Sequence, residues 1–181
     1  NNVNIASAEE VAKTCDYIFL GVKPQVLRSL CYELEGIFSS RTDRFVIVSM
    51  AAGINLLDLK DMCGGNYPII RIMPNMPVAV GEGMILYTVN DFVSKEDIDG
   101  FSESMKFAGL LDRIDEDKID AASCVSGCGP AFVFMFCEAL ADGAVECGLP
   151  RDKAMLYAAQ TLAGSATMLM QTGEHPGKLK D

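Results

Sequence analysis

Residues 17–24 read Tyr-Ile-Phe-Leu-Gly-Val-Lys-Pro, an apolar run of strand length that ends at a proline. A continuous run of this kind is typical of a parallel strand that helices cover on both faces. Pro24 suits the first turn of a following helix, because its ring fixes φ and its missing N–H needs no partner there. The stretch therefore predicts a buried strand followed at once by a helix.

The same arrangement recurs along the first two-thirds of the chain. Residues 45–50 and 68–73 are further apolar runs, and residues 54–62 between them have a helical pattern. Strands and helices that alternate with short connections predict right-handed crossovers and an open parallel sheet, which is the α/β class. The other elements expected in this part are a helix over 9–15, a weak strand over 83–89, a helix opened by the capping box Ser94-Lys-Glu-Asp97 and a strand over 110–114.

From residue 117 onward the pattern is helical only. We therefore expect an α/β domain over 1–116 and a helical domain over 117–181. The expected helices of the second domain cover residues 118–125, 130–147 and 151–172.

The helix expected over 130–147 is apolar on all sides, since Phe132, Phe134 and Phe136 point in different directions around it. The helix over 151–172 adds further apolar surface. Two or three helices cannot bury that much surface among themselves. Either a second copy of the chain covers it, or helices beyond the end of the sequence do, and the sequence leaves both readings open.

Composition excludes several classes of protein. Half of the residues are apolar and 22% are charged, as in a globular domain, and the 15 Lys and Arg against 25 Asp and Glu give a net charge of −10. An acidic chain without a basic run is a poor partner for nucleic acid. We expect no membrane span, because charged residues interrupt the apolar runs short of the ~20 residues required. Residues 1–10 also lack the pattern of a signal peptide.

The cysteines indicate a reduced, cytoplasmic protein without a metal site. The seven of them include no C-x-x-C pair, and the single histidine, His175, cannot complete a zinc cluster with scattered thiols. A catalytic Cys–His pair is the alternative, but no cysteine has an activating neighbour in the sequence.

Small residues, Pro and Asn gather at three successive strand ends, namely residues 21–24, 49–53 and 73–77. In an open parallel sheet, ligands bind at the carboxyl ends of the strands. Each segment alone is more simply a tight turn, but three together favour a nucleotide-type crevice. The usual G-x-G-x-x-G phosphate loop is missing.

Residues 126–130 read Ser-Gly-Cys-Gly-Pro and precede the apolar helix. The free N–H groups of a helix start, with Ser126, could hold a carboxylate or phosphate. The alternative is an ordinary loop between helices.

Several strings together resemble the pyrroline-5-carboxylate reductase family, in its order and over nearly the whole chain. They are DYIFLGVKP (16–24), IVSMAAGI (47–54), IIRIMPNMPVAVGEG (69–83), SGCGPAF (126–132), EALADGAVECGLPR (138–151) and GEHPGKLKD (173–181).

The resemblance implies a partial Rossmann-type dinucleotide-binding domain followed by a helical domain that forms homodimers or larger homo-oligomers. It implies reduction of L-1-pyrroline-5-carboxylate to L-proline, the last step of proline biosynthesis, with NADPH or NADH. Relative to the family, the chain is expected to lack the Gly-rich loop before residue 1 and the substrate loop after residue 181. The resemblance does not identify a catalytic residue. It also does not decide between NADPH and NADH or give the size of the oligomer.

The resemblance also assigns site residues. A protonated cyclic imine accepts hydride readily, so the site needs positioning more than a strong base. The cofactor-binding residues implied are Gly21, Val22, Lys23, Pro24, Met50, Ala51, Ala52 and Asn75, and the substrate-side residues are Ser126, Gly127, Cys128 and Glu174.

Two alternatives remain open. A related NADP-dependent imine or β-hydroxyacid reductase would share the fold, but the latter group commonly uses a lysine on the interdomain helix, and residues 130–147 contain none. A non-catalytic oligomerisation module is the other reading, and cofactor binding would separate it from the reductases.

Overall fold

The computed structural model describes residues 3–181 and divides into two compact units, Asn1–Cys128 and Gly129–Asp181. The division lies after the domain boundary expected at residues 116–117. The reason is helix α5 (Ile119–Ser126), which contacts strand β4 (Gly83–Val89) of the first unit and whose Ile119 is completely buried.

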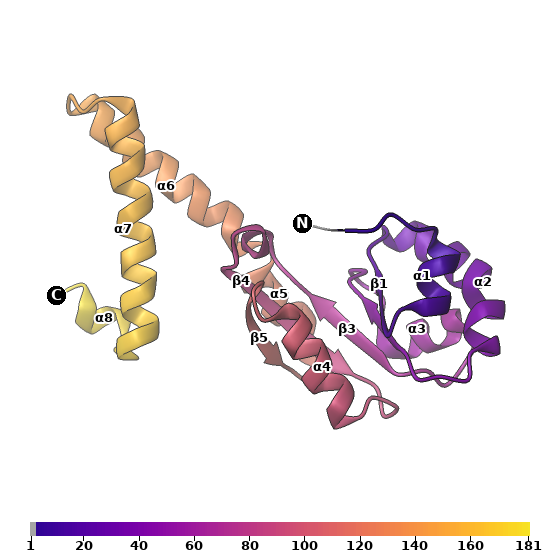
Figure 1. The fold of residues 1–181 in the computed structure, drawn as a ribbon. Helices are drawn as coiled ribbons and strands as arrows, with labels where there is room; N and C mark the ends of the chain where they lie inside the picture. The colour runs from indigo at the N-terminus through magenta and orange to yellow at the C-terminus, as the bar shows by residue number, and fades with distance from the viewer. Residues whose placement is uncertain (1–2) are drawn as a thin grey trace. The chain divides into compact units, whose positions relative to one another are not determined.

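The first unit is built on one sheet of five strands in the order β1-β2-β3-β4-β5 (Figure 1). Strands β1, β2 and β3 are parallel, as expected from the strand–helix alternation. Strand β4 pairs antiparallel with β3, and β5 pairs parallel with β4. The strands are β1 (Tyr17–Leu20), β2 (Val46–Ser49), β3 (Ile69–Met73), β4 (Gly83–Val89) and β5 (Gly109–Arg113).

The expectation of a wholly parallel sheet is therefore wrong at β4. The connection from β3 to β4 contains only a short 3-10 helix, η1 (Met76–Val80). A connection of that length is too short for a crossover helix, so the chain turns back on itself. Helix α4 (Lys95–Met105) lies between β4 and β5, and this longer connection restores the parallel direction of β5 relative to β4.

Local signals in the sequence place the helix ends. Pro24 stands at the first position of α2, the side chains and backbones of Ser94 and Asp97 form both bonds of a capping box, and Gly64 ends α3 at φ 73°. The helices of this unit are α1 (Ala8–Thr14), α2 (Pro24–Ser40), α3 (Leu56–Cys63), α4 (Lys95–Met105) and α5, with a 3-10 turn η2 (Glu116–Lys118) before α5.

Helices cover both faces of the sheet, as the continuous apolar strands predict. On one face α1, α2 and α3 pack through residues such as Leu27, Phe38 and Leu59 onto Ile47 and Ile69. On the other face Phe101 of α4 packs among side chains of β2, β3 and β4. Alternate residues of each strand therefore belong to different cores.

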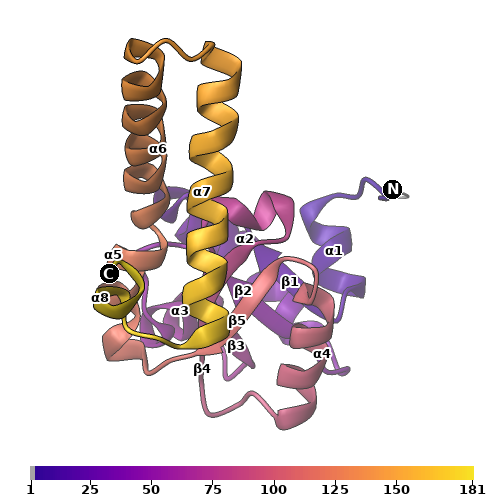
Figure 2. The same ribbon diagram turned by 90° about the vertical axis from the view of Figure 1, so that its left-hand side faces the viewer.

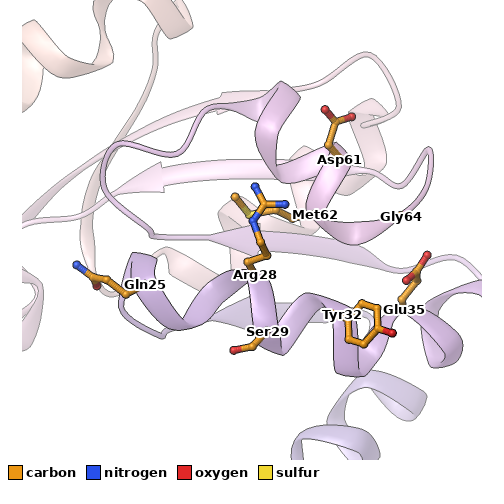
Figure 3. A pocket seen from close by; sticks show the side chains of 8 residues that line it. All are labelled: Gln25, Arg28, Ser29, Tyr32, Glu35, Asp61, Met62 and Gly64. Atoms are coloured by element: carbon orange, nitrogen blue, oxygen red, sulfur yellow. The ribbon is translucent and has the colours of Figure 1, made fainter.

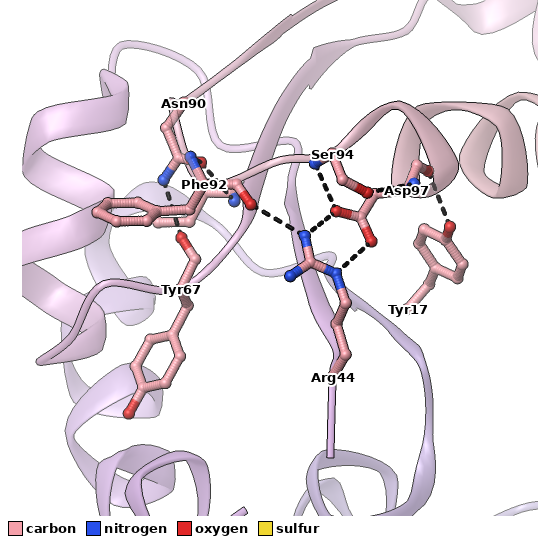
Figure 4. Close-up of polar contacts among 8 residues, drawn as sticks. Tyr17, Arg44, Tyr67, Asn90, Phe92, Ser94 and Asp97 are labelled. Carbon is pink, nitrogen blue, oxygen red and sulfur yellow. Dashed lines mark hydrogen bonds and ion pairs between the residues drawn. The ribbon is translucent and has the colours of Figure 1, made fainter. Parts of the chain in front are cut away.

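A polar cluster ties α4 to the base of β1 and β2 (Figure 4). The Arg44 guanidinium binds both carboxylate oxygens of Asp97, and the Asp97 carboxylate also accepts a hydrogen bond from the Ser94 N–H at 2.7 Å. The Tyr17 hydroxyl donates to the Asp97 carbonyl at 2.8 Å. Nearby, the Asn90 amide donates to the Tyr67 carbonyl at 2.9 Å.

The second unit is a helical hairpin with one short extra helix, which the sequence did not predict. Helices α6 (Gly129–Glu146) and α7 (Arg151–Thr172) lie side by side, and α8 (Pro176–Leu179) follows (Figure 2). Their shared core consists of small residues, because Ala141 packs against Ala154 and Ala158, and Cys137, Ala144 and Val145 surround them.

Most of the apolar side chains of this unit are exposed. Phe132, Phe134 and Phe136 are each more than half exposed. Among residues 3–181, one helical stretch, Glu116–Glu146, is long and apolar enough to cross a membrane by length and composition, with 6% of its apolar window buried. The uncharged run between Asp120 and Glu138 is 17 residues long, which comes closer to the ~20 residues of a membrane span than we expected.

Candidate functional site at the carboxyl edge of the sheet

The three predicted strand-end segments of the first unit lie along one edge of the sheet. The register pairs Leu20 with Ser49 and Ser49 with Arg71, so the loops after β1, β2 and β3 leave the sheet side by side. A Cβ on Gly21 would lie 3.9 Å from the Met50 Sδ atom, which shows that the first two loops touch. The structure thus brings together residues 21–24 and 50–52.

Most residues at this edge are small or apolar, and Lys23 is the charged residue among residues 21–24 and 50–53. Gly21, Lys23 and Ala52 are exposed, Val22, Pro24 and Met50 are half-buried and Ala51 is buried. Gly53 has a φ of 75° and open space around its Cα. Small residues of this kind let a ligand approach the main chain closely.

Asn75 connects the edge to α5. Its side-chain N–H donates to the Ser126 carbonyl at 2.9 Å, and its side-chain oxygen accepts the Met84 N–H at 2.9 Å. One amide thus joins the end of β3, the start of β4 and the end of α5. A residue predicted on the cofactor side and one predicted on the substrate side are in direct contact.

Residues 126–128 do not form the open helix start that we expected. Ser126 is the last residue of α5, and its hydroxyl donates to the Ala122 carbonyl at 3.3 Å. The Gly127 and Cys128 N–H groups donate to the Ser123 carbonyl at 2.7 and 3.2 Å. The expectation that the N–H groups of this segment are free is wrong for these two residues, because both N–H groups bond back to the last turn of α5.

Sequence reasoning missed a buried cation beside this edge. The Arg71 side chain, only 5% exposed, lies 3.1 Å from Glu116 and 3.4 Å from Asp120. The same Glu116 oxygen accepts the Leu56 N–H, at the start of α3, at 2.7 Å. The signal was present in the string Ile-Ile-Arg-Ile, because an arginine inside a buried strand requires acidic partners.

Glu174, predicted on the substrate side, lies in the second unit. Its carboxylate accepts a hydrogen bond from Lys178 at 2.6 Å and is half-buried. His175 caps α8 by accepting the Gly177 N–H at 3.0 Å. Within residues 3–181, no group of three His, Cys, Asp or Glu side chains is placed to hold a metal ion.

Comparison with known proteins identifies the family. Residues 116–181 match the family described as pyrroline-5-carboxylate reductase dimerisation. The chain is 43% identical over 182 residues to a pyrroline-5-carboxylate reductase of Arabidopsis thaliana, covering 99% of this chain and 64% of that protein. It is 44% identical over 175 residues to the Escherichia coli enzyme of the same name, covering 97% and 64%. The chain belongs to the pyrroline-5-carboxylate reductase family.

Solved structures of this family have the same fold. A Plasmodium falciparum pyrroline carboxylate reductase with NADP bound aligns with a TM-score of 0.87 at 34% identity, covering 98% of this chain and 66% of that one. A pyrroline-5-carboxylate reductase from Coxiella burnetii aligns with a TM-score of 0.86 at 30% identity, covering 97% and 65%. This chain therefore spans about two-thirds of the length of each of these family members.

Outside the pyrroline-5-carboxylate reductase family, a prephenate dehydrogenase from Aquifex aeolicus aligns with a TM-score of 0.51 at 12% identity. At that identity the likeness concerns the fold alone.

Proposed function

We propose that this chain acts as an oxidoreductase that reduces L-1-pyrroline-5-carboxylate to L-proline with NADPH or NADH. The observation that carries the proposal is the Asn75–Ser126 hydrogen bond of 2.9 Å at the carboxyl edge of a Rossmann-type sheet. It joins the loop that would face a nicotinamide to the helix end that would face the substrate. The family names and the NADP bound to the Plasmodium falciparum relative support it.

The residues at the sheet edge suit a nicotinamide cofactor. Gly21 and Ala52 expose backbone without bulky side chains, and Gly53 leaves open space beside them. Asn75 uses one of its two N–H donors and one oxygen lone pair internally, which leaves an N–H and a lone pair for a carboxamide. When bound, the cofactor would supply the hydride, and the loops after β1 and β2 would hold it.

The substrate needs little acid–base help from this chain. A cyclic imine that is protonated in solution is already electrophilic, so orientation lowers the barrier most. Asn75 contributes by holding the end of α5 against the sheet, and the exposed Cys128 beside Ser126 would contact the substrate side. The buried Arg71 contributes through Glu116 and Asp120, which hold the first turns of α5.

We also propose that α6 and α7 mediate homo-oligomerisation. Only one stripe of α6 is covered, by the small residues of α7, while its phenylalanines face outward. Residues 116–181 match a dimerisation family. We therefore propose that a second copy of this chain, and not a lipid bilayer, packs on the apolar stretch over 116–146. We expect the protein in the cytoplasm, where its free thiols stay reduced.

The test combines cofactor binding with turnover. NADPH fluorescence measures binding to the chain, and loss of nicotinamide absorbance with pyrroline-5-carboxylate measures reduction. Ala52→Phe would fill the exposed backbone at the sheet edge and is expected to weaken NADPH binding at least tenfold. Leu57→Phe, at an exposed position on α3, is the matched control and is expected to bind normally.

Each outcome has a separate meaning. Binding with turnover supports the reductase. Binding without turnover overturns reduction by this chain and keeps the cofactor site. Neither binding nor turnover, in a chain that still forms dimers, favours the non-catalytic oligomerisation module, which the exposed α6 also supports.

A further inference from the structure

Two cysteines far apart in the sequence meet in the core of the first unit. The Cys63 S–H group donates a hydrogen bond to the Cys31 Sγ atom, and the two sulfurs are 3.8 Å apart. Cys31 lies in the middle of α2 and Cys63 is the last residue of α3. Both side chains are fully buried among apolar residues.

The surface above the pair is a groove of about 570 Å³ between the same two helices (Figure 3). Arg28, one turn before Cys31, lies in it beside Met62, and Glu35, one turn after Cys31, closes over Gly64. A Cβ on Gly64 would lie 2.5 Å from the Glu35 carboxylate, so the helices approach closely at this end. The groove is lined by sequence neighbours of both cysteines, Tyr32 next to Cys31 and Met62 next to Cys63, and an oxidant in it has to pass these side chains to reach the buried sulfurs.

We propose that Cys31 and Cys63 are a redox-active dithiol, which a small peroxide oxidises to a disulfide that joins α2 to α3. The separation is longer than the S–S bond of about 2.05 Å, so side-chain rotation has to bring the sulfurs together. Hydrogen peroxide suits the site because it is hardly larger than water and can pass the groove.

The direction of the hydrogen bond assigns the two roles. The hydrogen bond from Cys63 lowers the pKa of the Cys31 thiol, with a smaller contribution from the Arg28 charge, and burial opposes both. The same hydrogen bond and burial raise the pKa of Cys63. Cys31 is thus the group that reacts as a thiolate, and Cys63 is the proton donor.

The reaction balances with peroxide as the only oxidant. The Cys31 thiolate attacks one peroxide oxygen, the O–O bond breaks, and Cys31 sulfenic acid and hydroxide form. Cys63 gives its proton to the hydroxide and attacks the Cys31 sulfur, and the sulfenic oxygen leaves as water once protonated by solvent. Overall, two thiols and one peroxide give a disulfide and two waters.

The sequence makes the product easy to identify. Trypsin releases Cys31 in the peptide 29–41 and Cys63 in the peptide 61–71, each with no other cysteine. Cys15 falls in the peptide 14–28, because trypsin does not cleave the Lys23–Pro24 bond, and the remaining four cysteines share the peptide 119–151. After treatment of the folded chain with hydrogen peroxide and alkylation, we expect a linked 29–41/61–71 pair that has lost two hydrogens.

Two variants complete the test. In Cys63→Ala, oxidation is expected to stop at the sulfenic acid, which dimedone would trap on the peptide 29–41. Cys15→Ser, the matched control, keeps the linked pair. The thermal midpoint is expected to rise on oxidation of the wild-type chain and of Cys15→Ser, and not of Cys63→Ala, because the new bond restricts the unfolded chain.

The result that overturns the proposal needs no variant. It is the recovery of peptides 29–41 and 61–71 as free thiols after peroxide has oxidised the exposed cysteines in the peptide 119–151. A link between either peptide and Cys15 would overturn it equally.

Discussion

Arg71 in β3 and Glu116 before α5 form an ion pair of 3.1 Å, although they are far apart in the sequence and lie on different elements. The Glu116 oxygen that accepts from Arg71 also accepts the Leu56 N–H at the start of α3. One carboxylate therefore fixes a strand, a helix start and the entry to α5. Together with the Asn75–Ser126 hydrogen bond, this ion pair sets α5 against the sheet.

Removal of the buried cation should destabilise the first unit. Arg71→Met leaves Glu116 without its partner, and we expect the free energy of unfolding to fall by on the order of 2 kcal/mol, less than for a fully buried pair because Glu116 reaches solvent. Chemical denaturation measures it. Asp120→Asn is the control, since the Asp120 side chain is 81% exposed and should cost almost nothing. An equal loss in both variants would show that Arg71 does not act through Glu116.

Asp97 should make stability depend on pH in the acid range. The hydrogen bonds from Arg44 lower the pKa of the Asp97 carboxyl below its ordinary value of 3.8, although burial opposes them. A lowered folded-state pKa gives stability that is present above the ordinary value and lost as the pH falls through the lowered one.

We therefore expect the wild-type chain to lose stability more steeply than Asp97→Asn below about pH 4, with the two curves converging in strong acid. Denaturation midpoints over a pH series measure this. Asp43→Asn is the control, because the pKa of Asp43 is also lowered by its partner, Arg41, but this carboxyl is exposed to screening. Parallel curves for wild type and Asp97→Asn would contradict the prediction.

Gly109 should tolerate no side chain. Its φ is 135°, and a Cβ there would lie 2.0 Å from the Gly83 carbonyl oxygen, where β4 and β5 begin to pair. Since backbone atoms cannot move aside cheaply, we expect Gly109→Ala to cost about 3 kcal/mol or more. Gly36→Ala on α2, where nothing lies within 4 Å, should instead stabilise by about 0.5–1 kcal/mol. A neutral Gly109→Ala would mean that β5 pairs differently.

Asn75 should matter for turnover beyond its effect on stability. Asn75→Asp still accepts the Met84 N–H but can no longer donate to the Ser126 carbonyl, which its charge repels. For the proposed reduction, we expect kcat/KM of Asn75→Asp to lie about 10–100-fold below that of the wild-type chain, equivalent to about 1.4–2.7 kcal/mol in the activation free energy. Asn75→Ala, which loses both bonds, provides the comparison. Unchanged kinetics in Asn75→Asp would remove Asn75 from the proposed site.

A charge on the outer surface of α6 should separate the oligomer. Phe134 is 56% exposed within one chain, and the proposed second copy would cover it. In Phe134→Lys, the same contact would bury an ammonium group without a partner, which costs free energy. We expect sedimentation to show a dimer or larger species for the wild-type chain and monomer for the variant. Lys153→Glu, at an exposed position on α7, is the charge-changing control. A Phe134→Lys chain that sediments like the wild type would place the interface elsewhere.

Much of the fold could be predicted from short-range signals. Pro24, the Ser94–Asp97 capping box and Gly64 each mark a helix end through bonds that span only a few residues. The apolar runs likewise predicted β1, β2 and β3 and the helices on both faces. Three predicted segments of the candidate site followed from these strands, because parallel strands end at a common edge.

The direction of β4 was not predictable from its own residues. The alternation of its side chains is the same in a parallel and an antiparallel pair, and only the short path through η1 decides between them. The N–H groups of Gly127 and Cys128 were misread for a similar reason. A glycine pair usually interrupts a helix, but here the backbone bonds to Ser123 extend the last turn of α5 to Cys128.

The sequence by itself determined most element types and helix ends, the family and the apolar character of α6, since each depends on neighbouring residues or on matching strings. Only the tertiary structure decided which distant groups meet: Arg71 with Glu116, Asn75 with Ser126, and Cys31 with Cys63. The physical reason is that a buried polar group or thiol gains its partner from packing. That packing depends on how strands and helices come together, and no local pattern records it.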